Sequence, residues 1–168
     1  NETSVAWGEV LRRADAPAAL VLSRQKLRTV PRGERYASAE GVAQGAYVLS
    51  EASSTPKLVL IATGSEVELA LDAQERLEAD GTPTRVVSMP CQEWFDEQPQ
   101  AYRDEVLPEG TARLSIEAGV AMGWSRYVGR DGGSVSIEHF GASAAGTRCF
   151  EEFGFTVDNV VAKAKALL

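Results

Sequence analysis

Short apolar runs that alternate with helix-like patterns constrain the fold of this chain more than any other feature. Segments that read as strands occupy residues 46–49, 58–62 (LVLIA), 84–89 (TRVVSM), 112–116 (ARLSI) and 135–137, and 58–62 is a continuous apolar run. Helical patterns occupy residues 66–79, 93–106, 147–153 and 157–168, and Pro99 breaks the second of them. Because strands alternate with helices, the sequence predicts an α/β fold, namely a three-layer α/β/α, Rossmann-like domain with a mostly parallel sheet.

The amino-terminal part of the chain does not continue this alternation. An amphipathic helix over residues 5–14 and a buried strand over 18–22 (AALVL) precede a stretch without periodicity that carries several basic residues. We therefore expect residues 1–27 to end one domain, 28–40 to form a linker with solvated basic residues, and 41–168 to form a second domain. The chain starts at Asn1 without Met and enters a helix at once, so we expect it to be the tail of a longer polypeptide.

Composition excludes several classes of partner and site. The net charge of −7 and pI of about 4.8 disfavour nucleic acid and anionic membranes, and no apolar run approaches the roughly 20 residues of a membrane span. Cys91, Cys149 and the single His139 cannot supply the four ligands of a structural zinc site. We expect both cysteines to be reduced thiols, as in a cytoplasmic protein.

The turn in LVLIATGSEVELAL, between a strand and a helix, is a place where α/β proteins often hold phosphate. It has one glycine and no lysine, so it matches neither the dinucleotide-binding nor the P-loop pattern. Ser65 and Glu68 instead fit a capping box, in which each side chain binds the other residue's amide. Thr156 is similarly placed to cap the last helix. The sequence therefore predicts a helix start at Ser65 and no phosphate site there.

Arg24 is the better candidate for binding an anion. It directly follows the predicted strand 18–22, and ligands of open α/β sheets gather at the carboxyl ends of strands. A guanidinium offers a planar fork of donors that matches a phosphate group. The alternative interpretation is a solvated arginine that opens the linker.

Ser143 lies in a Gly-Ala-Ser-Ala-Ala-Gly turn that half-resembles the nucleophile elbow of hydrolases. The only histidine, His139, precedes this serine at the end of the same predicted strand, whereas the base histidine of that fold follows its serine. We therefore expect no hydrolytic site and predict that Ser143 caps a helix. His139 is expected to be structural or to lie at an interface.

Five segments together resemble the carboxy-terminal portion of a bacterial transketolase, in the same order and over essentially the whole chain. They are LVLSRQ, IATGSEVELAL, RVVSMP, FGASA and FEEFGFTVDNVVAKAKALL. The resemblance implies that residues 1–27 are the last helix and strand of a thiamine-diphosphate pyrimidine-binding domain. Residues 41–168 would be the carboxy-terminal domain, for which a domain-packing or regulatory role is the cautious interpretation.

The resemblance also implies an activity. Transketolases are cytoplasmic homodimers of the pentose phosphate pathway that use thiamine diphosphate and magnesium or another divalent cation. They transfer a two-carbon ketol unit from a ketose phosphate to an aldose phosphate. The arginine of the family's LSRQ motif contacts the substrate phosphate, and it matches Arg24. The family's Gly-Asp-Gly motif, pyrimidine-activating glutamate and channel histidines are absent, so the chain alone is expected to bind neither cofactor nor metal and to be inactive.

Two alternatives stay open. The chain could be a stand-alone, non-catalytic module that binds an anion or docks a partner, but the strand predicted at 18–22 would then lack a sheet. It could also be the tail of another thiamine-dependent enzyme, such as a deoxyxylulose-phosphate synthase or the β-subunit of a 2-oxo-acid dehydrogenase. The LSRQ and FGFTVDNVV segments favour transketolase.

Overall fold

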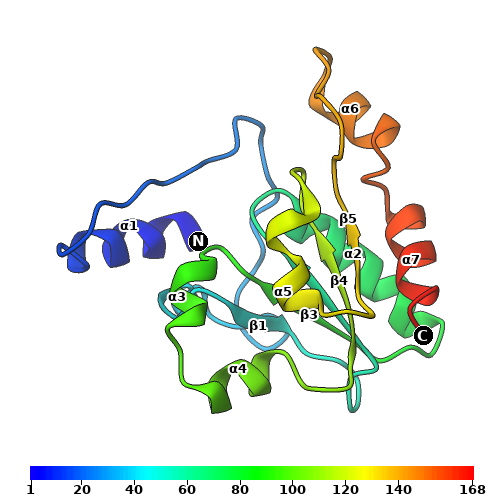
Figure 1. Ribbon diagram of the computed structural model, residues 1–168, viewed down its shortest axis with the longest axis horizontal. Coiled ribbons are helices and arrows are strands. Elements are labelled where there is room, and N and C mark those ends of the chain that lie inside the picture. Colours follow the sequence, from blue (N-terminus) through cyan, green and yellow to red (C-terminus); the bar gives the residue numbers. More distant parts are fainter.

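A five-stranded sheet runs through the centre of the molecule in the computed structural model, which describes residues 1–168 (Figure 1). The strands are β1 (Tyr47–Ser50), β2 (Leu58–Ala62), β3 (Thr84–Ser88), β4 (Ala112–Ile116) and β5 (Gly133–Val135). Their order across the sheet is β1-β3-β2-β4-β5, with β1 antiparallel to β3 and every other pair parallel. The mostly parallel sheet predicted from the sequence is confirmed.

Helices cover both faces of this sheet. The long helix α2 (Glu66–Ala79) and α7 (Val157–Lys165) pack together on one face. The opposite face is covered by α3 (Gln92–Asp96), α4 (Gln100–Val106) and α5 (Ser125–Val128). Helices α3 and α4 are separated just before Pro99, so the predicted break of the helical pattern at this proline is confirmed. The three-layer arrangement is therefore confirmed.

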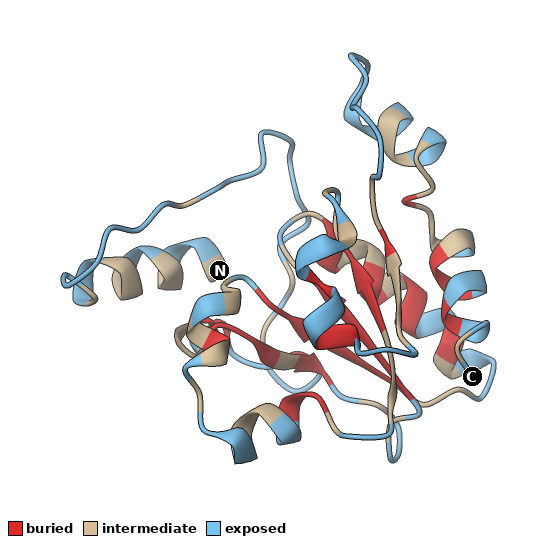
Figure 2. Cartoon of the chain, in the orientation of Figure 1, coloured by how far each residue is buried: buried red, intermediate tan, exposed pale blue.

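Strand β2 shows why the sheet lies at the centre. All five of its side chains are fully buried, and alternate residues point to opposite faces. Leu58 and Leu60 join the core under α2 and α7, while Val59 and Ile61 join the core under α3 and α5. Figure 2 shows the buried residues concentrated in these central strands. A strand with apolar residues on both faces can only sit inside a layered fold.

The remaining helical segments are short or peripheral: α1 (Glu2–Arg12), the 3₁₀ turns η1 (Ala39–Gln44) and η2 (Ala121–Gly123), and α6 (Gly146–Glu152). The turn η1 starts inside the predicted linker 28–40. No helix combines the length and the apolar character that crossing a bilayer requires.

The three predicted helix caps differ in outcome. The cap predicted at Ser143 is wrong, because the residue that precedes α6 is Ala145 and no side chain caps this helix. The Thr156 hydroxyl accepts a hydrogen bond from the Asn159 amide at 3.3 Å, so the cap of α7 is confirmed. The capping box at Ser65 is wrong, because the Ser65 hydroxyl donates to the Glu66 carboxylate at 3.1 Å and caps no amide. Ser65 already has helical backbone angles (φ −66°, ψ −27°), whereas a capping residue usually has extended ones.

The predicted strand at 18–22 does not form. Val21 and Leu22 are 96% and 57% exposed, and the segment has no strand as a neighbour. A β-strand is stabilised by hydrogen bonds to an adjacent strand, and no strand of this chain reaches the segment. The helix predicted just before it is present as α1, and Figure 1 shows the chain after α1 running as an open arc back to the sheet.

Candidate functional site

Arg24 lies on the exposed segment that connects α1 to the sheet domain. The Ser23 hydroxyl is 4.0 Å from the position that a Cβ would take on Gly64. Gly64 belongs to the turn that directly follows β2 and has a left-handed backbone (φ +55°). Although the strand predicted before Arg24 is missing, the turn that carries Arg24 therefore lies beside the carboxyl end of the central strand β2.

Arg24 differs from the other arginines of this region because it pairs with no carboxylate. Arg28 contacts Glu68 and Asp72, Arg32 lies 3.7 Å from Glu2, and Arg35 lies 2.6 Å from Glu75. The prediction of a solvated basic linker is therefore wrong for these three residues, since acidic side chains of α1 and α2 neutralise them. Arg24, exposed and unpaired, keeps its guanidinium available for an external anion.

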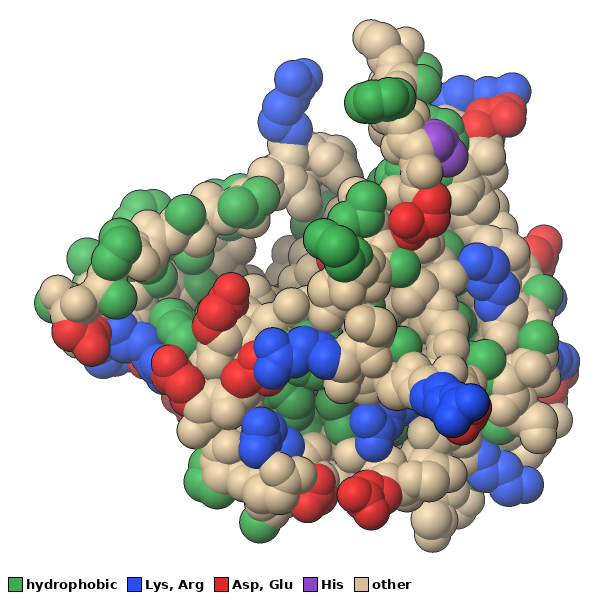
Figure 3. Space-filling view, viewed as in Figure 1, with side chains coloured by type: hydrophobic (Ala, Val, Ile, Leu, Met, Phe, Trp, Pro, Cys, Tyr) green, Lys and Arg blue, Asp and Glu red, His purple; other side chains and the backbone are tan.

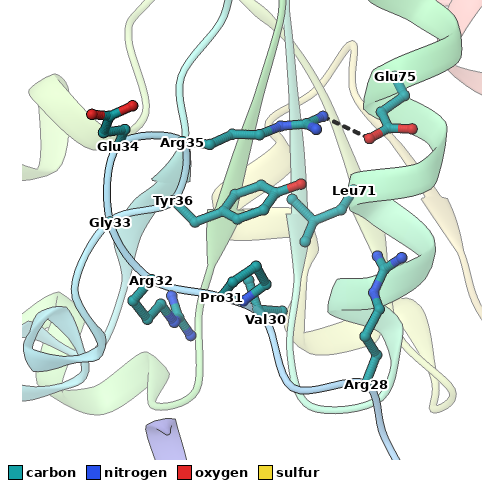
Figure 4. Close-up of a pocket in the computed structure, with 10 residues that line it drawn as sticks. All are labelled: Arg28, Val30, Pro31, Arg32, Gly33, Glu34, Arg35, Tyr36, Leu71 and Glu75. Atoms are coloured by element: carbon teal, nitrogen blue, oxygen red, sulfur yellow. Dashed lines mark hydrogen bonds and ion pairs between the residues drawn. The ribbon is translucent and has the colours of Figure 1, made fainter.

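We call residues 28–36 the strap, because they run along α2 and are held to it by ion pairs. A cavity of about 470 Å³ lies between the strap and α2 (Figure 4). Arg28, Arg35, Tyr36 and Leu71 are among its lining residues, and the Arg35 guanidinium lies 5.1 Å from the centre of the Tyr36 ring. Because carboxylates already pair with its arginines, this cavity is a poorer anion site than Arg24.

Two carboxylates that are far apart in the sequence lie near each other at the carboxyl edge of the sheet. Glu66 begins α2 just after β2, and Glu117 directly follows β4, the parallel neighbour of β2. Glu66 is only 4% exposed, and the Glu117 Oε2 atom is buried without a hydrogen-bond partner. Each of these residues follows a strand that the sequence predicts. The sequence does not show that the two strands are neighbours, and only this brings the carboxylates together.

Burial changes the protonation of both carboxylates. Burial raises the pKa of Glu66, although it accepts hydrogen bonds from its own amide, the Ser65 hydroxyl and the Ala118 amide. Burial, followed by the charge of Glu66, raises the pKa of Glu117 from its ordinary value of 4.5 to about 7. Glu117 therefore changes charge near neutral pH, next to the turn that neighbours Arg24.

Ser143 and His139 are both exposed. The His139 Nδ1 atom is 2.8 Å from the Phe140 carbonyl, and its ring packs edge-on against Phe153 with centroids 4.7 Å apart. His139 makes no hydrogen bond to Ser143, so the geometry of a nucleophile and its base is missing.

The side chains of this chain do not form a site for the metal that the family resemblance implies for a full enzyme. No three His, Cys, Asp or Glu side chains of residues 1–168 come together as a metal site. Cys91 and Cys149 are both free thiols.

Comparison with known proteins identifies what the chain resembles. Residues 45–156 match the family model described as the transketolase-like TK C-terminal domain. The chain is 52% identical to transketolase 1 of Escherichia coli over 168 residues, which are 99% of this chain and 25% of that protein.

Solved structures agree with the sequence match. A transketolase from Leishmania mexicana has 42% identity and a TM-score of 0.88, with 99% of this chain and 23% of that chain covered. A Pichia stipitis transketolase solved with sedoheptulose 7-phosphate has 35% identity and a TM-score of 0.89. The match covers 99% of this chain and 24% of that chain. The chain therefore spans about a quarter of the length of its relatives and matches their fold throughout.

Proposed function

This chain belongs to the transketolase family, and on that premise we propose that the protein containing it transfers a two-carbon ketol unit from a ketose phosphate to an aldose phosphate. The chain is the carboxy-terminal portion of such an enzyme. Its partners in the proposal are phosphorylated sugars, the remainder of the transketolase polypeptide and a second copy of the protein. Thiamine diphosphate and a divalent cation would be held by that remainder, and this portion alone would be inactive.

In our proposal, Arg24 is the residue of this portion that binds the substrate. Its guanidinium would donate forked hydrogen bonds to the sugar phosphate and fix the end of the substrate remote from the transferred carbons. The observation that supports this role is that Arg24 alone among Arg24, Arg28, Arg32 and Arg35 is free of carboxylates. It also lies on the turn beside Gly64, at the carboxyl end of β2.

The domain division is part of the same proposal. Residues 1–27 would complete a pyrimidine-binding domain, 28–40 would link the domains, and 41–168 would be the carboxy-terminal domain. The exposed apolar side chains of Val21 and Leu22 support a packing partner for the first segment. The two free thiols support a reducing, cytoplasmic location.

The two alternatives are less well supported. A stand-alone module would leave Val21 and Leu22 in water without a role, and the match to known transketolases begins near the amino terminus of this chain. A different thiamine-dependent enzyme is disfavoured by 52% identity to transketolase 1 of Escherichia coli.

The test of the Arg24 role uses the full-length enzyme and the variant Arg24→Ala. Loss of a charge-assisted hydrogen bond costs about 1.5–3 kcal/mol, so the KM for phosphorylated ketoses should rise roughly tenfold or more. The KM for a non-phosphorylated ketol donor should change little, because that donor has no phosphate to lose.

The matched control is Lys26→Ala, which removes the same charge from the same exposed segment. It should leave both KM values nearly unchanged, since general attraction of anions is weak at physiological salt. Equal effects of Arg24→Ala on the two donors would mean that Arg24 does not recognise phosphate.

A further inference from the structure

We propose that Arg28 is a positioning residue that holds Arg24 in place for the substrate phosphate. This inference rests on the proposed function of Arg24 and adds a second residue to the same site. Arg28 lies at the start of the strap and, in the proposal, does not touch the substrate. It acts by fixing the short segment that carries Arg24 to helix α2.

The contacts of Arg28 fix its backbone as well as its side chain. The Arg28 Nη2 atom donates to Asp72 Oδ1 at 3.0 Å, and its Nε atom lies 3.5 Å from Glu68 Oε1. The Arg28 backbone N–H donates to Glu68 Oε2 at 3.4 Å. Glu68 and Asp72 are one helical turn apart, so they present adjacent carboxylates on one face of α2. We call these three residues the Arg28 clamp.

Apolar packing does not hold the Arg24 segment. Residues 21–29 are all exposed, and Leu27 is 42% exposed. The segment passes beside Gly64 at Ser23, and the Arg28 clamp ties its other end to α2. A short exposed segment with few buried contacts opens easily. The polar contacts of Arg28 are therefore the main restraint on the position of Arg24.

The ion pair of Arg35, also in the strap, does not restrain the backbone as the Arg28 clamp does. Arg35 pairs with Glu75 at 2.6 Å and is about as exposed as Arg28, at 60% against 45% of the side chain. No contact joins its backbone N–H to that carboxylate, and it lies farther along the chain from Arg24. Removing Arg35 deletes a comparable ion pair without releasing the Arg24 segment, which makes it a matched control.

The effect of losing the clamp should be moderate. Exposed ion pairs stabilise a conformation only modestly, which corresponds to a population change of up to about fivefold. The apparent affinity falls in proportion to the fraction of molecules in the binding-competent conformation. We therefore expect Arg28→Ala to raise the KM for a phosphorylated ketose by roughly two- to fivefold, with kcat and the KM for a non-phosphorylated donor unchanged.

The experiment measures kcat and KM of the full-length enzyme with xylulose 5-phosphate and with a non-phosphorylated ketol donor. The variants are Arg24→Ala, Arg28→Ala, Asp72→Asn, the double variant Arg24→Ala with Arg28→Ala, and Arg35→Ala. If Arg28 acts through Arg24, the double variant should match Arg24→Ala alone. Arg35→Ala should behave as the unmodified enzyme.

Asp72→Asn separates positioning from direct contact by the sign of its effect. If Arg28 positions Arg24, weakening the clamp raises the KM for xylulose 5-phosphate. If Arg28 itself bound the phosphate, removal of the competing carboxylate would lower that KM, and the proposal would be overturned.

Two further outcomes would also refute the role of Arg28. The first is an unchanged KM in Arg28→Ala while Arg24→Ala raises it, which would leave the function of Arg24 standing. The second is evidence of a general structural role, shown either by an equal rise for both donors or by an equal effect of Arg35→Ala. Failure of the proposed function itself would show separately, as an equal effect of Arg24→Ala on both donors.

Discussion

Replacing Glu117 by Gln should stabilise this chain at pH 8 and have little effect at pH 5. Glu117 Oε2 is buried without a partner, and burial, together with the charge of Glu66, raises the pKa of Glu117 from 4.5 to about 7. A difference of that size would correspond to roughly 3 kcal/mol if the carboxyl were fully enclosed. Because Glu117 is only half-buried, solvent screening reduces the expected gain to about 1–2 kcal/mol.

The direction of the pH dependence follows from proton binding. Between pH 4.5 and about 7, the folded chain holds the Glu117 proton more tightly than the unfolded chain does. Stability therefore falls as pH rises through this window, and the full cost of ionising Glu117 is present only above it. Gln keeps the size of the side chain and carries no charge, so it removes the cost at pH 8. At pH 5 the native carboxyl is mostly protonated and there is little cost to remove.

The assay is urea denaturation of the 168-residue chain at pH 5 and pH 8, followed by circular dichroism. The control is Glu34→Gln, which changes the net charge equally at an exposed position without an ion pair. Equal stabilisation by Glu117→Gln at both pH values would refute the reasoning. So would destabilisation at pH 8, because it would mean that the ionised carboxylate is a favourable partner in the fold.

Two further predictions, one on glycine conformation and one on a helix cap, are checked by the same denaturation assay. Gly45→Ala should lower the free energy of unfolding by about 3 kcal/mol, since its Cβ would lie 2.3 Å from the Phe95 amide nitrogen at a φ of +82°. Gly81→Ala, with a φ of +79° but open space around it, should cost only about 1 kcal/mol, and an equal cost at both sites would contradict the steric argument. Thr156→Ala should cost about 1 kcal/mol through loss of the α7 cap, while Thr156→Ser should cost much less; equal losses would mean that the hydroxyl is not responsible.

The main elements of the sheet domain could be predicted because their signals are local. Strands β2, β3 and β4 have nearly the predicted bounds, since each has buried apolar residues within its own few positions. The break between α3 and α4 follows from Pro99, and the cap of α7 follows from Thr156. The β-strand predicted at 18–22 failed because an apolar run forms a strand only when another strand is available for hydrogen bonding.

The polar contacts of the site were less predictable. The Ser65 hydroxyl binds the Glu66 carboxylate, and Glu68 faces Arg28 from the strap, so the expected capping box does not form. Charged side chains choose their partners among groups that the fold brings near, and these groups are often far apart in the chain. Arg24 remains a prediction from position and resemblance. The structure adds that Arg24 is exposed and unpaired and that the preceding residue, Ser23, lies beside Gly64.

The sequence by itself determined the α/β class, the family and the arginine to test, because hydrophobic periodicity and linear motifs are encoded over short stretches. Only the tertiary structure decided that β4 lies beside β2, which brings Glu117 to Glu66. It also decided that Arg28 is neutralised on α2 while Arg24 is left free. Strand order and long-range ion pairs depend on how the layers pack, and residue spacing along the chain carries no direct record of that packing.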